Sequence, residues 1–234
     1  MIFEQIRTRD RRAIKLRNSY TRISKQTLDL WRSELELPAN PDQFRSRVEE
    51  ILDTTSVPAA TLFNQGGLGF LRDAHIASRV ATALSADTVR LCEDRWPDFE
   101  LTFHENRMLF EATEADIVGR RRGIEYLEDD NEIEEDPVES WRARLGAIPA
   151  ALNQVISKKI GKRYSSSANL VVYVNLDCFG AYLQEGKSLL YWGTRSAKDA
   201  FVEVFALWEG RLFSLWKNGH INAKVWNTAR VSDL

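Results

Sequence analysis

Apolar positions are most regular between residues 140 and 174. Residues 140–164 have apolar side chains at helical spacing, which predicts a helix. The apolar face of that helix is made by Leu152, Val155, Ile156 and Ile160. Residues 170–174 are apolar at every position, as is typical of a strand that is buried on both faces of a sheet. We therefore expect this helix and this strand to lie at the centre of the core.

Shorter elements on both sides of this centre complete a sheet. Upstream, apolar spacing predicts a helix over 70–85, and a short strand is expected over 88–92. Residues 98–103 and 108–113 alternate with a period of two and are joined by a polar turn, which favours a pair of antiparallel strands. Downstream of the buried strand, we expect a loop, then a helix around 196–201 and then a hairpin.

The C-terminal hairpin has the clearest turn signal in the chain. Residues 202–208 and 211–216 flank the dipeptide Glu209-Gly210, where a two-residue turn requires a positive φ. The elements then follow the order helix, strand, hairpin, helix and buried strand. This order indicates an α/β domain with a mixed central β-sheet flanked by helices.

The N-terminal part is expected to be a helical extension. Residues 1–36 have a helical character, and a second helix is expected to start at Pro41-Asp42. A glycine-rich turn follows at 64–69, but no Lys-Ser/Thr comes after it, so it is not a phosphate-binding loop. These breaks predict an N-terminal helical extension over residues 1–66 and an α/β domain over residues 67–234.

The composition is that of a soluble globular protein. Of the 234 residues, 44% are hydrophobic and 28% are charged, and the formal net charge is -2, so nucleic-acid binding would have to come from local patches. Cys92 and Cys178 have no Cys or His partner nearby, which argues against a zinc site. No apolar run approaches the roughly 20 residues that span a bilayer, and the first residues lack the apolar core of a signal peptide. We therefore expect a cytoplasmic protein that does not contact membranes.

Two local concentrations of charge each have two interpretations. The first 25 residues carry eight Arg or Lys against two acidic residues. This basic segment is either a solvated helix face or an arm that binds along the phosphates of a nucleic acid. Residues 125–139 hold nine acidic side chains. Such a block is usually solvated, and the alternative is a segment that binds a protein partner or competes for a basic groove. A homodimer is also left open.

Two carboxylates suggest a metal site. Asp98 opens the first strand of the antiparallel pair and Glu111 closes the second, so the two side chains can converge on one divalent cation. The backbone carbonyl of Ala112 is a third candidate ligand. Mg²⁺, or Mn²⁺ in its place, needs only one or two carboxylates when waters and substrate phosphates complete its shell. If the two carboxyls lay more than about 8 Å apart, they could not share an ion.

Such sites also need a cation near the nucleophile, and Thr113, which occupies that place on the strand, cannot supply it. Lys159 is the natural substitute, because it projects into the middle of the apolar face of its helix. It either reaches the carboxylates or extends to the surface. Lys162 and Arg163 would then contact substrate phosphate. Asp73 is either the N-cap of its helix, which is the commoner case, or an acid that points at the site.

The order of these residues resembles the PD-(D/E)xK nuclease superfamily. Asp98 matches its first motif acid, Glu111 the second, and Asp73 the acid often found in the first helix, whereas Thr113 replaces the motif lysine. Within the superfamily that lysine can migrate to the following helix, which would suit Lys159. The resemblance implies a restriction-endonuclease-like core and a metal-dependent nuclease that acts on nucleic acid, DNA more than RNA. The alternative is a nuclease-like module that binds or regulates without cutting.

Overall fold

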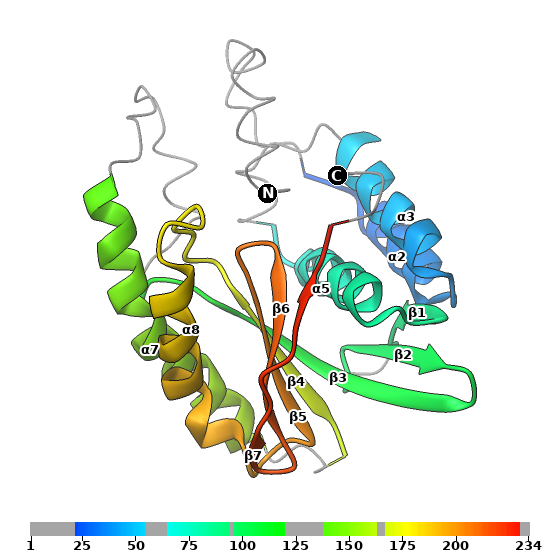
Figure 1. The fold of residues 1–234 in the computed structure, drawn as a ribbon. Coiled ribbons are helices and arrows are strands. Elements are labelled where there is room, and N and C mark those ends of the chain that lie inside the picture. The colour runs from blue at the N-terminus through cyan, green and yellow to red at the C-terminus, as the bar shows by residue number, and fades with distance from the viewer. Residues whose placement is uncertain (1–21, 55–64, 94–95, 120–137, 163–166, 230–234) are drawn as a thin grey trace.

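An eight-stranded mixed sheet lies between two layers of helices (Figure 1). The computed structural model describes residues 22–54, 65–93, 96–119, 138–162 and 167–229. Helices α2, α3 and α5 cover one face of the sheet, and α7 and α8 cover the other. The predicted α/β class with a mixed central sheet is therefore confirmed.

The elements have the following bounds. The helices are α2 (Lys25–Glu36), α3 (Pro41–Thr54), α5 (Gly69–Leu84), α7 (Val138–Gly161) and α8 (Leu183–Thr194). The strands are β1 (Thr88–Leu91), β2 (Phe99–Phe103), β3 (Asn106–Ala115), β4 (Asn169–Val174), β5 (Glu203–Trp208), β6 (Arg211–Lys217), β7 (His220–Ile221) and β8 (Val225–Asn227).

The strand order is β1-β2-β3-β4-β5-β6-β7, with β8 also paired to β6. The two ends of the sheet are antiparallel, and β3, β4 and β5 are parallel. All six residues of β4 are buried, which confirms the central strand predicted from its apolar run. Between β5 and β6, Glu209 and Gly210 have φ values of 50° and 68°, so the predicted two-residue turn is also confirmed.

Alternation along the central strands divides the core in two. On β3, Phe110 and Ala112 face the side of α2, α3 and α5, whereas Ala115 faces the side of α7 and α8. On β4, Val171 packs on the first side and Val172 on the second. Because both faces are covered by helices, a polar side chain that points from β3 toward either layer is held in a largely buried environment.

The described part of the N-terminal extension is helical and packs on the sheet. Helix α3 starts at Pro41, as predicted, and the side chain of Asn40 accepts a hydrogen bond from Gln43 N at 2.9 Å. Between α2 and α3, Ala39 pairs with Val89 of β1 through two backbone hydrogen bonds of 2.8 and 3.1 Å. The division at residues 66 and 67 stays a prediction, since residues from both sides of it share one core cluster.

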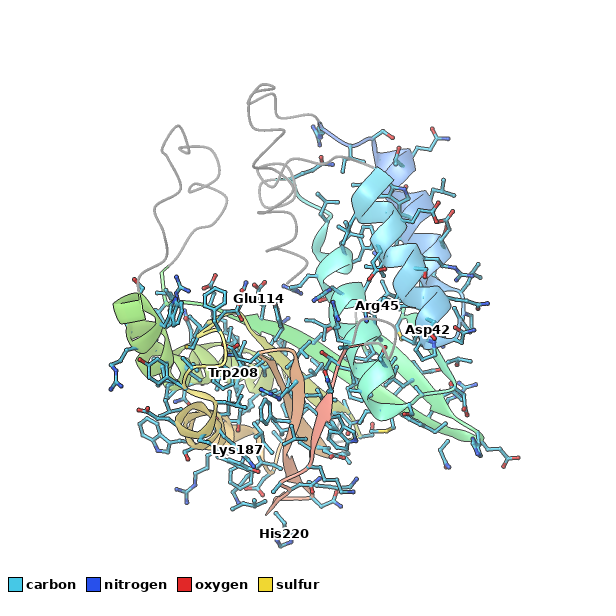
Figure 2. All side chains as sticks on the ribbon, turned by 45° about the horizontal axis from the view of Figure 1, so that its top comes forward. Asp42, Arg45, Glu114, Lys187, Trp208 and His220 are labelled. Atoms are coloured by element: carbon cyan, nitrogen blue, oxygen red, sulfur yellow. The ribbon has the colours of Figure 1, made fainter. Side chains whose placement is uncertain are left out.

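The segment between β4 and β5 differs from expectation. The predicted helix around 196–201 is wrong: only a short 3-10 turn lies there, and the helix α8 precedes it. Glycines in α8 explain the error, because glycine usually marks a loop. A Cβ on Gly186 would overlap the indole ring of Trp208, which lies on the α8 side of the sheet (Figure 2). These glycines therefore allow the helix to pack closely.

Several sequence predictions lie outside the described residues. These are residues 1–21, which hold most of the basic charges near the N-terminus, and residues 125–137 of the acidic block. Among the helices that the structure describes, none has both the length and the apolar character that crossing a membrane requires.

Candidate functional site

Strands β2 and β3 bring Asp98 and Glu111 close together. Phe99 of β2 pairs with Phe110 of β3, and Asp98 N also donates to Phe110 O at 3.0 Å. Asp98 therefore lies just before the first paired residue of β2, and Glu111 directly follows Phe110 on β3. Alternation along β3 places Glu111 on the same face as Ala115, which is the side of α7.

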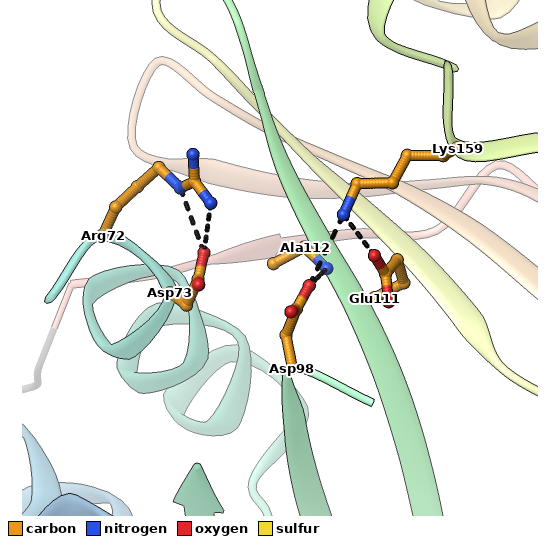
Figure 3. A network of polar contacts seen from close by, with 6 residues as sticks. All are labelled: Arg72, Asp73, Asp98, Glu111, Ala112 and Lys159. Carbon is orange, nitrogen blue, oxygen red and sulfur yellow. Dashed lines mark hydrogen bonds and ion pairs between the residues drawn. The ribbon is translucent and has the colours of Figure 1, made fainter. Parts of the chain in front are cut away.

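Lys159 joins the two carboxylates from the other side of the helix–sheet interface (Figure 3). Its Nζ donates to Glu111 Oε1 and lies 3.6 Å from Asp98 Oδ2. Because 3.6 Å is the longer of these two contacts, the two carboxylate oxygens are at most twice 3.6 Å, or 7.2 Å, apart. This separation lies within the limit of about 8 Å set by the length of metal–oxygen bonds.

The burial of these groups explains why they pair. The side chain of Glu111 is 1% exposed and that of Lys159 is 13% exposed. A buried ionised group is costly unless it is paired with the opposite charge. Ile156, one turn earlier on α7, is fully buried, so the same helix face that packs on the sheet carries Lys159 to Glu111. Of the two directions open to this lysine, the structure has the one toward the carboxylates.

Ala112 provides backbone groups at the same place. Its N–H donates to Asp98 Oδ2 at 2.7 Å. In a strand, the N–H and C=O of one residue point to the same side, so the carbonyl of Ala112 also faces the β2 side of β3. Strand β2 starts just after Asp98, while β3 continues to Ala115 alongside β4. Two carboxylates and one carbonyl therefore meet where β3 extends past β2.

Asp73 is not the N-cap of its helix. Helix α5 starts at Gly69 with Leu68 as its N-cap, so Asp73 lies a full turn inside it. Arg72 Nε and Nη2 both donate to Asp73 Oδ1, at 3.0 and 2.7 Å. Burial raises the pKa of Asp73, the neighbouring charge of Asp98 adds to this increase, and Arg72 and Lys159 oppose it. Asp73 thus belongs electrostatically to the group around Asp98.

Three residues of this group were missed by the sequence analysis. They are Arg72, Glu114 and Asn175. Asn175 Nδ2 donates to Glu114 Oε1 at 2.7 Å just beyond the end of β4. Strand alternation places Glu114 on the same face as Ala112, opposite to Glu111. Periodicity gave no reason to single out these residues, because the packing of α5 brings in Arg72, and the parallel pairing of β3 and β4 brings together Glu114 and Asn175.

The remaining predicted residues are less closely involved. Thr113 is half-buried, pairs with Val172 of β4 and lies on the same face as Glu111. Lys162 is exposed just past the end of α7. Arg163 lies outside the described residues. The predicted phosphate contacts of Lys162 and Arg163 therefore stay predictions.

Acidic and basic side chains gather around β3. Among the described residues, the carboxylates of Asp73, Asp98, Glu111 and Glu114 lie near the cations of Arg72 and Lys159. Within the described ranges, no group of three or more His, Cys, Asp or Glu side chains is arranged to hold a metal ion. An ion here would use Asp98, Glu111, the Ala112 carbonyl and oxygens from outside the chain, a set that suits Mg²⁺.

Comparison of the chain with protein-family models, with curated proteins and with solved structures finds no match. A functional argument for this chain therefore starts from the side chains and the geometry of the site. The chemistry present is a buried acid, a second acid within reach of the same ammonium, and a strand edge with backbone oxygens beside them.

Proposed function

We propose that the protein is a divalent-metal-dependent nuclease that hydrolyses phosphodiester bonds in nucleic acid, with DNA as the expected substrate. One observation carries the proposal: Lys159, from a helix 48 residues further along the chain, contacts both Asp98 and Glu111. An acid just before β2, an acid within β3 and a lysine in one cluster are the groups that metal-assisted phosphodiester hydrolysis uses.

The order of elements supports the same proposal. Helix α5, the meander β1-β2-β3, helix α7 and strand β4 follow each other along the chain. This is the order that the PD-(D/E)xK resemblance implies. Asp98 lies just before the second strand of the meander, and Glu111 lies on the third. A restriction-endonuclease-like core is therefore part of the proposal.

The residues divide the chemical work as follows. Asp98, Glu111 and the Ala112 carbonyl would hold Mg²⁺ or Mn²⁺, and a bound ion supplies positive charge that polarises the phosphoryl oxygens and activates water. Lys159 then donates hydrogen bonds to the attacking water or to the phosphoryl oxygens, whose negative charge grows in the transition state. Water attacks phosphorus, the bond to the leaving oxygen breaks, and that oxygen takes up a proton.

The proposal is tested with purified protein, labelled DNA or RNA, and Mg²⁺ or Mn²⁺. We expect cleavage by the wild type, and a loss of about a hundredfold or more in Asp98→Asn and Glu111→Gln, because even outer-shell partners of metal ligands cost about 10–100-fold when changed. Glu105→Gln, at the exposed tip of the β2–β3 hairpin, should cleave like the wild type. Cleavage that survives both substitutions would show that another site, or a contaminant, is responsible.

A second candidate is a nuclease-like module that binds or regulates without cutting. Two observations favour it: Thr113 stands where the motif lysine would be, and Lys159 already neutralises part of the carboxylate pair. This candidate predicts salt-sensitive binding to nucleic acid or to a protein partner, with no cleavage under any metal. The same assay, run beside a binding measurement, separates the two.

A further inference from the structure

Arg72 lies beside the carboxylate pair, but on the opposite side of β3 from Lys159 (Figure 3). Its Nε and Nη2 are both used by a single oxygen, Asp73 Oδ1. Its third nitrogen, Nη1, points away from Asp73 (Figure 3) and makes no hydrogen bond within the described residues, and 38% of the side chain is exposed. One edge of the guanidinium is therefore fixed, and the other is accessible.

The pairing with Asp73 is not an ordinary helix-stabilising contact. Stabilising charge pairs on a helix are three or four residues apart, because residues next to each other in sequence do not share a face. Arg72 and Asp73 are adjacent, so the arginine side chain must turn along the helix to reach the carboxylate. This contact holds the guanidinium in one orientation, whereas a solvent-exposed arginine without such a contact would change between rotamers.

The surroundings of Arg72 place it at the site. Burial acts to lower the pKa of Arg72, but Asp73, Glu114 and Asp98 outweigh this effect and raise the pKa. The guanidinium thus lies within electrostatic reach of Asp98, which also contacts Lys159. One cation stands on each side of β3, where that strand extends past β2.

We propose that Arg72 binds a phosphate of the nucleic-acid backbone, and that Asp73 is the positioning residue that holds its guanidinium ready. The inference rests on the proposed function, because it assumes a phosphodiester chain that crosses this edge of β3. A guanidinium suits the task, since its planar fork can give two parallel hydrogen bonds to one phosphate. The accessible edge, which includes Nη1, would supply them. Arg72 would then increase the affinity and fix the position of the nucleic acid. Asp98, Glu111 and Lys159 would act at the phosphodiester bond that breaks.

The test is binding of a short fluorescein-labelled DNA duplex, and of the matching single strand, measured by anisotropy over a range of salt concentrations in EDTA. Without metal no cleavage occurs, so the readout does not depend on catalysis. Arg72→Gln should weaken binding about tenfold, because the charge-assisted hydrogen bonds of the guanidinium to a phosphate are roughly twice as strong as the neutral ones that glutamine could give. It should also reduce the salt slope by about 0.9 for the duplex, or about 0.7 for the single strand, as expected for one lost phosphate contact.

Two further variants make the result specific. Arg195→Gln removes one exposed positive charge from the turn after α8, in the other helical layer, and should change neither affinity nor slope. Arg72→Lys keeps a charge near Asp73 but loses the fork, so it should fold like the wild type, bind more weakly and keep the salt slope. This variant also covers the case in which Arg72→Gln does not fold.

The outcomes separate this inference from the proposed nuclease activity. Weaker binding and a smaller slope in Arg72→Gln alone support the phosphate contact, even if the wild type cuts nothing. Wild-type affinity and slope in Arg72→Gln, or an equal loss in Arg195→Gln, overturn it, even if the wild type cuts DNA. Absence of binding by the wild type to both probes overturns it as well.

Discussion

The contact between Lys159 and Glu111 should be a large contribution to the stability of the metal-free protein. The perturbation is Lys159→Met, which keeps a similar length and apolar stem but removes the ammonium. Breaking a buried ion pair from one side costs about 3–5 kcal/mol, because it leaves the other charge buried with less compensation. Glu111 is 1% exposed, but Lys159 is 13% and Asp98 is 20% exposed. Water therefore reaches part of the cluster, and we expect a cost near the lower end, about 3 kcal/mol.

The assay is urea unfolding followed by circular dichroism, in EDTA, for a double-mutant cycle. Glu111→Gln alone and the double variant complete the cycle with Lys159→Met. The double variant should be more stable than the sum of the single losses implies, with a coupling energy of about 1.5 kcal/mol or more, because the two groups are in direct contact. Lys158→Met, an exposed lysine in the same helical turn, should stay within about 0.5 kcal/mol of the wild type.

Two results would refute this reasoning. A cost below about 1 kcal/mol for Lys159→Met would be that of an exposed surface pair. A coupling energy near zero would show that the two residues contribute independently. If the nuclease proposal also holds, Mg²⁺ should stabilise Lys159→Met more than the wild type, since a cation then replaces the missing ammonium beside Glu111.

The fold supports two more predictions. Burial lowers the pKa of His75 from 6.5 to about 3, and the charge of Arg79 acts in the same direction. The unfolded chain therefore takes up a proton at a higher pH than the folded one. The free energy of unfolding should fall by about 1.4 kcal/mol per pH unit as pH decreases between these two values. In His75→Phe, the urea midpoint should depend less on pH across this window. Gly186→Ala should destabilise the protein by about 3 kcal/mol or more, because the new methyl group would overlap Trp208. Gly146→Ala, in open space on α7, should instead stabilise the protein by about 0.5–1 kcal/mol in the same unfolding assay. Equal effects of the two glycine substitutions would contradict the packing of α8 described above.

The parts of the fold that sequence could predict are those with one clear period. The apolar runs of α7 and β4 were strong enough to place both elements, and the position of Lys159 on the α7 face followed from its angle alone. Helix α8 was missed because its glycines, which serve close packing, have the same appearance in sequence as a loop. A glycine in a packed helix is buried and a glycine in a loop is usually exposed. Burial depends on residues from distant segments, so the sequence around the glycine does not show which case applies.

The site shows the same limit. Asp98 and Glu111 could be proposed together because a hairpin fixes its own register. Arg72 and Glu114 could not, because their neighbours are brought in by the packing of α5 and by the parallel pairing of β3 with β4. The N-cap, one of the two interpretations of Asp73, would require α5 to start after residue 73, whereas the helix starts at Gly69. Boundaries and side-chain directions were thus the least predictable features, and the site depends on both.

The pairing of Ala39 with Val89 has a consequence for how the protein behaves at high concentration. Strand β1 ends the strand order, and the outer side of such a strand offers unpaired backbone groups to other chains. Two hydrogen bonds between Ala39 and Val89, one donated by each residue, occupy part of that side. A truncated chain that began at the predicted domain boundary would keep its strands but lose this cover. We therefore expect the segment between α2 and α3 to protect part of this edge against edge-to-edge pairing, and a shortened version prepared for crystallisation or labelling should retain it.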